Sequence, residues 1–187
     1  DIEEVLAGIT LRKFIESVGA RSSAPGGGSV SASIAAVGAA LGAMVAKLTL
    51  GVRKFESVDS KMRELVPPLH EAMSDLIPMI DADTDAFNDY VEALRLPEET
   101  VSEQKFKQEQ LQLGLKKAID IPLTTMKLGD KAWDAMVATA KYGNPASKSD
   151  VQVGAKALET GIWGAYQNVL INMADIKDQA YKTETMA

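Results

Sequence analysis

Hydrophobic residues recur every three or four positions along almost the whole chain, and few stretches show the two-residue alternation of a half-buried strand. This pattern predicts an all-α protein. We expect five or six helices, and their short connections favour a helical bundle. The expected main helices cover about residues 9–18, 29–50, 59–94, 101–142 and 150–173. The long helices are expected to be kinked at internal prolines, which are Pro67, Pro68, Pro78 and Pro122.

Capping residues set the expected helix ends. Thr100 and Glu103 have the spacing of a capping box before the fourth helix, and Ser149 and Gln152 repeat that spacing before the fifth. Gly143 is expected to end the fourth helix in a left-handed conformation. The first helix should carry an apolar side and stop at Gly19, its apolar residues being Leu11, Phe14, Ile15 and Val18.

Two of the expected helices carry almost no charge. Between Val151 and Ala174 only Lys156 and Glu159 are charged, and the 29–50 helix is rich in alanine. Both helices have glycines at spacings that admit a close neighbour, namely Gly38, Gly42, Gly154, Gly161 and Gly164. We interpret the Gly38/Gly42 pair as core packing. Helices so poor in charge should be wrapped by others, so we expect dimerisation through buried helices, giving a homodimer or a larger even-numbered oligomer.

Composition narrows the function classes. The 187 residues are 46% hydrophobic and 25% charged, which indicates one globular domain over 1–187. The absence of cysteine excludes disulfides, thiolate metal sites and cysteine nucleophiles, and it is compatible with a cytoplasmic location. His70 is the only histidine, so we expect no metal site and interpret it as a solvated or capping residue. A net charge of −6 argues against nucleic acid as a partner.

No membrane partner is expected either. The most membrane-like window, residues 29–46, lacks charge but consists largely of alanine, glycine and serine. Such a window is only weakly hydrophobic, and a buried helix with close neighbours explains it better than a membrane span.

A glycine-rich stretch, SSAPGGGSV at residues 22–30, precedes the second helix, for which Ser29 is the expected N-cap. Three glycines after Pro25 indicate positive φ or a close approach of bare backbone. No Lys-Ser or Lys-Thr follows, so the stretch is not a P-loop. Two interpretations stand: a tight turn between helices, or backbone amides and a helix N-terminus that approach a ligand.

One carboxylate falls on the apolar side of the third helix. At about 100° per residue, Asp83 lies within the apolar stripe, whereas Asp81, Asp85, Asp89 and Glu92 lie opposite or oblique to it and are expected to be solvated. Its companions in the stripe are Leu76, Met79, Ile80, Phe87, Tyr90 and Leu94. Burial would raise the pKa of Asp83 and suit it to proton transfer. The alternative is that Asp83 pairs with a buried lysine or caps another helix.

Three stretches carry a family resemblance: SAPGGGSV, DADTDAF and SDVQVGAKALETGIWGAYQNVLIN. Together they resemble the cyclodeaminase domain of formiminotransferase-cyclodeaminase and the related stand-alone cyclodeaminase and methenyltetrahydrofolate cyclohydrolase proteins, over about Leu11 to Tyr181. The resemblance implies a dimerising helical domain that converts 5-formiminotetrahydrofolate to 5,10-methenyltetrahydrofolate with release of ammonia. That activity is an ammonia lyase step of histidine degradation and needs no cofactor beyond the folate substrate. The resemblance also implies that Asp83, the second acid of the DAD motif, is the catalytic aspartate.

Further substrate contacts are expected around this acid. Asn168 and Asn172 lie one turn apart and could meet the amide-like edge of a pterin, or they could form hydrogen bonds between helices. The expected substrate-binding residues are Pro25, Gly26, Gly27, Gly28, Ser29, Lys156, Asn168 and Asn172.

Two functions besides cyclodeaminase remain open: a methenyltetrahydrofolate cyclohydrolase and a non-catalytic helical interaction module. We expect a single-function member or a fragment, without a formiminotransferase domain before Asp1 and with a formiminotransferase domain or protein as partner. The family's long helix beyond "YKTETMA" is also expected to be missing.

Overall fold

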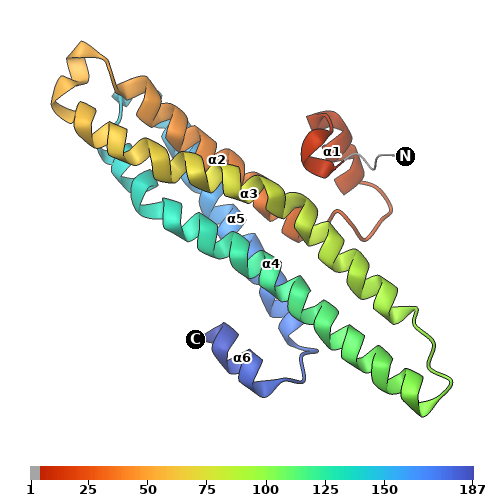
Figure 1. The fold of residues 1–187 in the computed structure, drawn as a ribbon. Coiled ribbons are helices and arrows are strands. Elements are labelled where there is room, and N and C mark those ends of the chain that lie inside the picture. The colour runs from red at the N-terminus through yellow and green to blue at the C-terminus, as the bar shows by residue number, and fades with distance from the viewer. Residues whose placement is uncertain (1–4) are drawn as a thin grey trace.

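The computed structural model describes residues 5–187, which form α-helices and 3-10 helices and no strand. The long helices α2 to α5 lie side by side as a bundle, while α1 and α6 lie at its edges (Figure 1). The α-helices are α1 Leu11–Val18, α2 Gly27–Thr49, α3 Asp59–Leu94, α4 Val101–Tyr142, α5 Lys148–Met173 and α6 Gln179–Met186. The 3-10 helices are η1 Leu6–Gly8, η2 Arg53–Val58 and η3 Pro145–Ser147. The prediction of an all-α bundle is confirmed.

The capping box at the start of α4 is confirmed. The Thr100 hydroxyl accepts a hydrogen bond from the Glu103 N–H at 3.2 Å, and the Glu103 carboxylate accepts one from the Thr100 N–H at 2.9 Å. The second predicted box, Ser149 with Gln152, is wrong. The turn η3 leads directly into α5, whose N-cap is Ser147, so Ser149 is already helical and cannot cap.

The end of α4 is where the sequence predicts it, but its conformation differs. Gly143 has φ −68° and ψ 167°, which is extended backbone, so the predicted left-handed stop is wrong. The Gly143 N–H still donates to the Thr139 carbonyl at 2.8 Å. The next residue, Asn144, donates its N–H to the Thr49 hydroxyl at 2.8 Å. This contact with the end of α2 explains why the chain leaves α4 extended.

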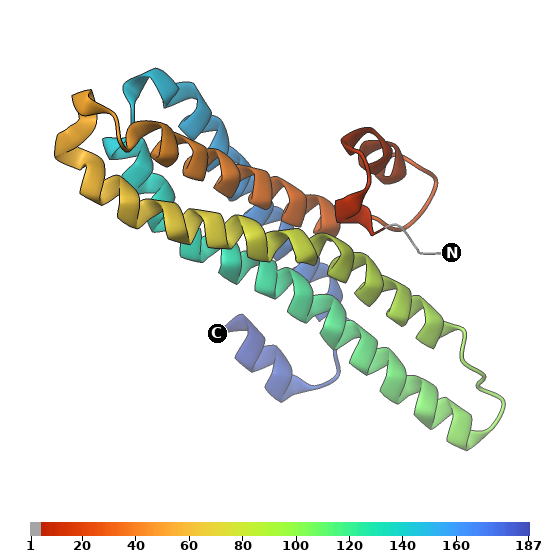
Figure 2. The ribbon, with the colours of Figure 1, turned by 45° about the horizontal axis from the view of Figure 1, so that its top comes forward.

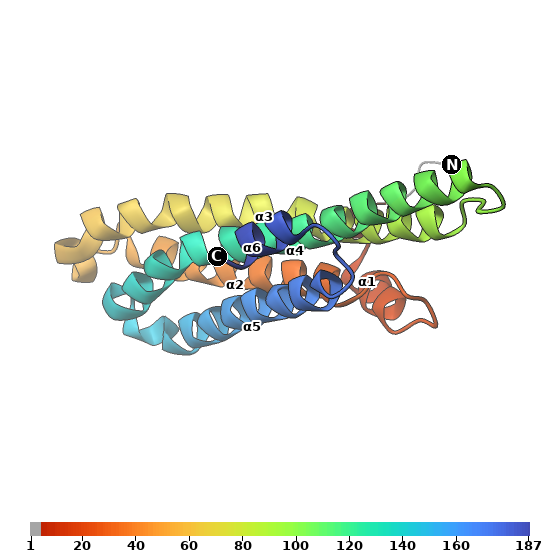
Figure 3. The same ribbon diagram turned by 90° about the horizontal axis from the view of Figure 1, so that it is seen from below.

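The prolines do not interrupt the long helices. α3 continues through Pro67, Pro68 and Pro78, and α4 continues through Pro122. α4 curves over its second half as it approaches α5 (Figure 3). The C-terminal part of α3 and the N-terminal part of α4 run on past the start of α2 as a two-helix arm (Figure 2).

α2 is the central helix of the bundle. A β-carbon on Gly38 would lie 2.6 Å from the backbone nitrogen of Leu158 in α5, and one on Gly42 would lie 2.8 Å from the Met136 side chain in α4. At Gly38 the neighbour is backbone, so only glycine permits this approach, whereas at Gly42 the neighbour is the flexible end of a side chain. Both glycines lie inside the bundle, so the core-packing interpretation of the pair is confirmed. Among the described residues α2 alone is long and apolar enough to cross a membrane, but 61% of its most apolar window is buried inside the bundle.

α2 and α5 are nevertheless not covered on every side within the single chain. Val37 on α2 is 58% exposed, and on α5 Trp163 is 62% and Ile171 73% exposed. The expectation that these helices are wrapped all round is therefore not met by one copy, and the oligomer stays a prediction.

Candidate functional site

The candidate site lies where the N-terminus of α2 meets α3. The Ser29 N–H donates a hydrogen bond to Asp83 Oδ2 at 2.9 Å, joining residues 54 apart in the chain. Ser29 is completely buried, and its hydroxyl donates to the Ile80 carbonyl at 2.6 Å and lies 3.0 Å from the Thr84 hydroxyl. Ser29 is therefore not the N-cap of α2, which is Gly26. Its hydroxyl fastens the first turn of α2 to α3 instead.

Gly28 explains the glycine-rich stretch. A β-carbon built on Gly28 would overlap the carboxylate of Asp83. A β-carbon on Gly27 would lie 3.2 Å from the Asn168 side-chain nitrogen of α5, which is tight but tolerable. Among the described residues positive φ occurs only at Gly51, so close approach and not a special backbone conformation requires glycine here.

The Asp83 carboxyl is half-buried, as its position in the apolar stripe predicts. Burial raises its pKa, and the hydrogen bonds from the Ser29 N–H and hydroxyl only partly offset this. No lysine or arginine within residues 5–187 forms an ion pair with it, so pairing with a buried lysine is not observed. The alternative that Asp83 caps another helix is observed, because its carboxylate accepts a hydrogen bond from the Ser29 N–H in the first turn of α2.

The two oxygens of Asp83 have different surroundings. Oδ2 accepts the hydrogen bond from the α2 terminus, whereas Oδ1 accepts none from the part of the chain that is described. Oδ1 lies over the bare backbone of Gly28. One oxygen is thus held in place, and the other keeps its lone pairs for a ligand.

The two asparagines of α5 have different roles. Asn168 lies against Gly27, at the edge of the site, and its side-chain nitrogen donates to the Gly164 carbonyl at 2.8 Å. Asn172 donates to the Asn168 carbonyl at 2.9 Å and, at 3.4 Å, to the Ala118 carbonyl of α4. The structure therefore brings Asn168 to the site, while Asn172 has the alternative role of joining helices.

Lys156 is not brought to Asp83 within one chain. Its side chain is 76% exposed and forms an ion pair with Glu159 at 2.6 Å. It lies twelve residues before Asn168 on the same helix, a rise of about 18 Å. Pro25 and Gly26 lie half-buried just ahead of α2 and so border the site.

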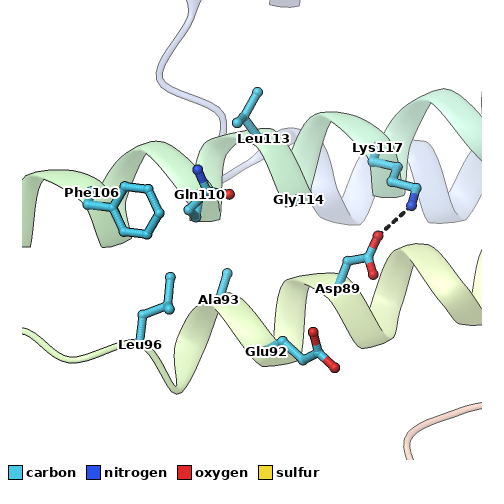
Figure 4. Close-up of a pocket in the computed structure, with 9 residues that line it drawn as sticks. All are labelled: Asp89, Glu92, Ala93, Leu96, Phe106, Gln110, Leu113, Gly114 and Lys117. Atoms are coloured by element: carbon cyan, nitrogen blue, oxygen red, sulfur yellow. Dashed lines mark hydrogen bonds and ion pairs between the residues drawn. The ribbon is translucent and has the colours of Figure 1, made fainter. Parts of the chain in front are cut away.

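Among the other acids of α3, one departs from its predicted environment. Asp85 is exposed as predicted, and Asp89 is exposed and forms an ion pair with Lys117 of α4 (Figure 4). Asp81, predicted to be solvated, accepts hydrogen bonds from the backbone N–H groups of Leu6 at 2.5 Å and Ala7 at 3.1 Å, so that prediction is wrong. Its partners lie 75 and 74 residues away, and no local pattern indicates them.

Two cavities of about 370 Å³ flank the α2–α3 junction. One lies between α3 and α4 in the two-helix arm and has mixed lining, which includes Asp89, Glu92, Phe106, Leu113 and Lys117 (Figure 4). The other is apolar and lies between α1 and α2. Across residues 5–187 no three histidine, aspartate or glutamate side chains are grouped so that they could hold a metal ion. His70 is exposed, as predicted.

This fold and site define a class of protein: an all-α bundle in which a half-buried carboxylate on one helix lies against the glycine-rich start of another. Among the described residues this carboxylate has no cationic partner. The particular family follows from sequence comparison. A sequence profile for formiminotransferase-cyclodeaminase matches residues 10–187, and the chain therefore belongs to that family.

Individual relatives agree with this assignment. The chain is 49% identical to formimidoyltransferase-cyclodeaminase of Gallus gallus over 94% of its length and 52% identical to that of Dictyostelium discoideum over 98%. It spans only 32% and 33% of those proteins, about a third of their length. A methenyltetrahydrofolate cyclohydrolase of Methylorubrum extorquens is 29% identical, over 95% of this chain and 85% of that protein.

A solved structure shares the fold. The crystal structure of formiminotetrahydrofolate cyclodeaminase from Thermotoga maritima superimposes with a TM-score of 0.83 at 26% identity, and the match covers 95% of this chain and 85% of the other.

Proposed function

We propose that this chain is a formimidoyltetrahydrofolate cyclodeaminase, which converts 5-formiminotetrahydrofolate to 5,10-methenyltetrahydrofolate and ammonia. The observation that carries the proposal is Asp83, whose Oδ2 is held by the α2 terminus and whose Oδ1 keeps its lone pairs. The names and identities of the relatives in Gallus gallus and Dictyostelium discoideum support the same substrate. The proposed class of reaction is an ammonia lyase step, and its proposed place is histidine degradation.

The chemistry needs one group that moves protons. Nitrogen ten of the folate attacks the carbon of the protonated formimino group, so a carbon–nitrogen bond forms and nitrogen ten becomes positively charged. Asp83 Oδ1 accepts the proton from nitrogen ten and returns it to the amino group, which leaves as ammonia. The positive charge remains on the methenyl product. Atoms and charge therefore balance without any further reactant.

The surroundings of Asp83 suit this role. A raised pKa makes the carboxylate a stronger base, while the hydrogen bond from Ser29 keeps it oriented. Its negative charge also favours the cationic substrate and product. No lysine or arginine competes for that charge among the described residues.

The remaining contacts in this proposal come from the start of α2 and from α5. Gly28 brings bare backbone against Oδ1, the adjoining Gly27 is exposed, and Asn168 offers an amide beside Gly27 at the edge of the site. We assign these groups to the pterin ring, whose edge carries amide-like donors and acceptors. Ser29 is buried and takes no part in substrate contact.

A second candidate function is methenyltetrahydrofolate cyclohydrolase. The similarity to the Methylorubrum extorquens protein, which this chain covers by 85%, favours it. The same base would then activate water against the methenyl carbon. Identity of 29%, against 49% and 52% for the cyclodeaminase relatives, makes it the weaker candidate.

One assay distinguishes the candidates. The protein is incubated with 5-formiminotetrahydrofolate, and ammonia and the absorbance of the methenyl product are followed together. Release of ammonia with matching formation of the methenyl product supports the cyclodeaminase. Turnover of methenyltetrahydrofolate alone supports the cyclohydrolase, and no turnover of either substrate supports a non-catalytic helical module.

The proposed partners follow from the family. We propose a formiminotransferase domain or protein as the source of substrate, since the relatives' names include that activity and this chain spans about a third of them. A cytoplasmic homodimer or larger even-numbered oligomer, with the exposed apolar faces of α2 and α5 in its interfaces, completes the proposal.

A further inference from the structure

Both acids of the DAD motif bind backbone N–H groups of segments far away in the chain. Asp83 accepts from Ser29 at the start of α2, and Asp81 accepts from Leu6 and Ala7 at the start of η1. Residues two positions apart on a helix are separated by about 200° around its axis, so Asp81 and Asp83 project from different sides of α3. The N-terminal segment, residues 5–28, thus lies between two attachments to α3, one at Leu6 and Ala7 and one at Ser29 directly after it.

Between the two attachment points lie α1 and the glycine-rich stretch. α1 stands apart from the four long helices, beside the start of α2 (Figure 2). It faces α2 across the apolar cavity of about 370 Å³, and its residues Leu11 and Ile15 remain 74% and 60% exposed. Packing therefore holds α1 only weakly, so the position of this segment depends on its attachment at each end.

The glycine-rich stretch connects the N-terminal segment to the candidate site. Gly28 lies directly against Asp83 Oδ1, and Gly27, which precedes it and lies against Asn168, continues into the chain that runs back to η1. If the attachment at η1 is lost, only the second of these two attachments, at the start of α2, remains. The loop ahead of Gly27 then moves more freely beside the substrate position.

We propose that Asp81 is a positioning residue for substrate binding: it fastens the N-terminal segment to α3 and thereby holds the glycine-rich stretch beside the reacting oxygen of Asp83. The inference rests on the proposed cyclodeaminase function. It assigns Asp81 no proton transfer, because both of its oxygens accept backbone hydrogen bonds and it projects from a different side of α3 than Asp83.

The test compares Asp81→Ala and Asp81→Asn with Asp85→Ala in the whole protein. Asp85 is the matched control, because it is exposed and lies two residues beyond Asp83, as Asp81 lies two residues before it. One readout is kcat and KM for 5-formiminotetrahydrofolate. The other is the rate of trypsin cleavage after Arg12 and Arg21, which lie in the N-terminal segment, followed by mass spectrometry. Thermal unfolding shows that each variant is folded.

For Asp81→Ala we expect KM to rise by about tenfold, as loss of a charge-assisted hydrogen bond implies, with kcat within about twofold of the parent and faster cleavage after Arg12 and Arg21. Asp81→Asn keeps one oxygen acceptor and should show smaller changes in both readouts. Asp85→Ala should match the parent.

Three results would overturn the inference. They are parental KM and cleavage in Asp81→Ala, a fall in kcat at unchanged KM and cleavage, or equal effects in Asp85→Ala. If the parent protein shows no cyclodeaminase activity, the proposed function fails, and trypsin cleavage alone then decides whether Asp81 fastens the segment. If Asp81→Ala does not fold, Asp81→Asn takes its place in both readouts.

Discussion

The substitution Asp83→Asn separates the two roles that the structure gives this residue. The amide oxygen of asparagine can accept the Ser29 N–H in place of Oδ2, so the attachment of α2 to α3 is kept. The amide NH₂ group then takes the place of Oδ1. It cannot accept a proton, and it removes the negative charge beside the cationic substrate.

The expected loss of activity follows from general base catalysis. A positioned base typically contributes a factor of about 100 to 10,000, and we expect kcat to fall by at least about a hundredfold, a rise of roughly 3 kcal/mol in the barrier. KM should change less, because the loop and Asn168 remain in place. Asp85→Asn, on the exposed side of α3, should keep kcat within about twofold of the parent.

The substitution Asp83→Asn also has a predictable effect on the free energy of unfolding. Burial raises the pKa of Asp83 above the ordinary 3.8, so the folded protein holds this proton more tightly than the unfolded chain. Ionisation of Asp83 therefore lowers the free energy of unfolding as pH rises above about 3.8 and through the raised pKa. Asp83→Asn should raise Tm at pH 7, and this gain should disappear as pH falls below 3.8.

The assay is production of ammonia and methenyltetrahydrofolate from 5-formiminotetrahydrofolate, with circular dichroism to follow unfolding at each pH. The reasoning is refuted if Asp83→Asn keeps kcat within about threefold of the parent. It is equally refuted if Asp83→Asn unfolds the chain while Asp81→Asn abolishes kcat, since Asp83 would then be a structural residue only.

Three further predictions test the packing around this site. Gly28→Ala places a β-carbon on the Asp83 carboxylate, so it should abolish activity and lower the free energy of unfolding in urea by about 1–3 kcal/mol. Gly27→Ala should cost less, and equal effects of the two substitutions would contradict the close-approach argument. Tyr181→Phe removes the hydrogen bond of 2.7 Å to Asp120 on α4, so it should lower the free energy of unfolding by about 1 kcal/mol and speed hydrogen exchange in α6. Unchanged exchange would show that α6 docks without this hydrogen bond. In sedimentation velocity at micromolar concentration we expect an even-numbered oligomer, and a 20.0 kDa monomer would refute the predicted dimerisation.

The helices are predictable from sequence because their signals are local. The three-to-four-residue period fixes helix type, and the Thr100 capping box needs only residues three apart. Errors occur where a tertiary contact decides the outcome. Gly143 leaves α4 extended because Asn144 binds Thr49, 95 residues away, and Ser29 is buried against α3 and cannot cap its own helix.

In the candidate site, too, features with a local signal are predictable and features set by tertiary contacts are not. The helical wheel places Asp83 in the apolar stripe, and the structure confirms that it is half-buried with a raised pKa. Asp81 could not be read from that wheel, because its binding partners belong to the distant N-terminal segment. Lys156 is one of two charged residues between Val151 and Ala174, and in the structure it lies on the surface and forms an ion pair with the other, Glu159.

The docking of α2 on α3 also makes the acidity of the Asp83 carboxyl a reporter of folding. Part of the burial that raises its pKa arises when α2, whose Ser29 lies 54 residues before Asp83, docks on α3. In a chain in which α3 has formed but α2 is still detached, we expect the pKa of Asp83 to lie closer to its ordinary value. The titration midpoint of a ¹³C-labelled Asp83 carboxyl, measured by NMR during refolding, would therefore time the docking of these two helices, and the basicity proposed for catalysis would arise at that same moment.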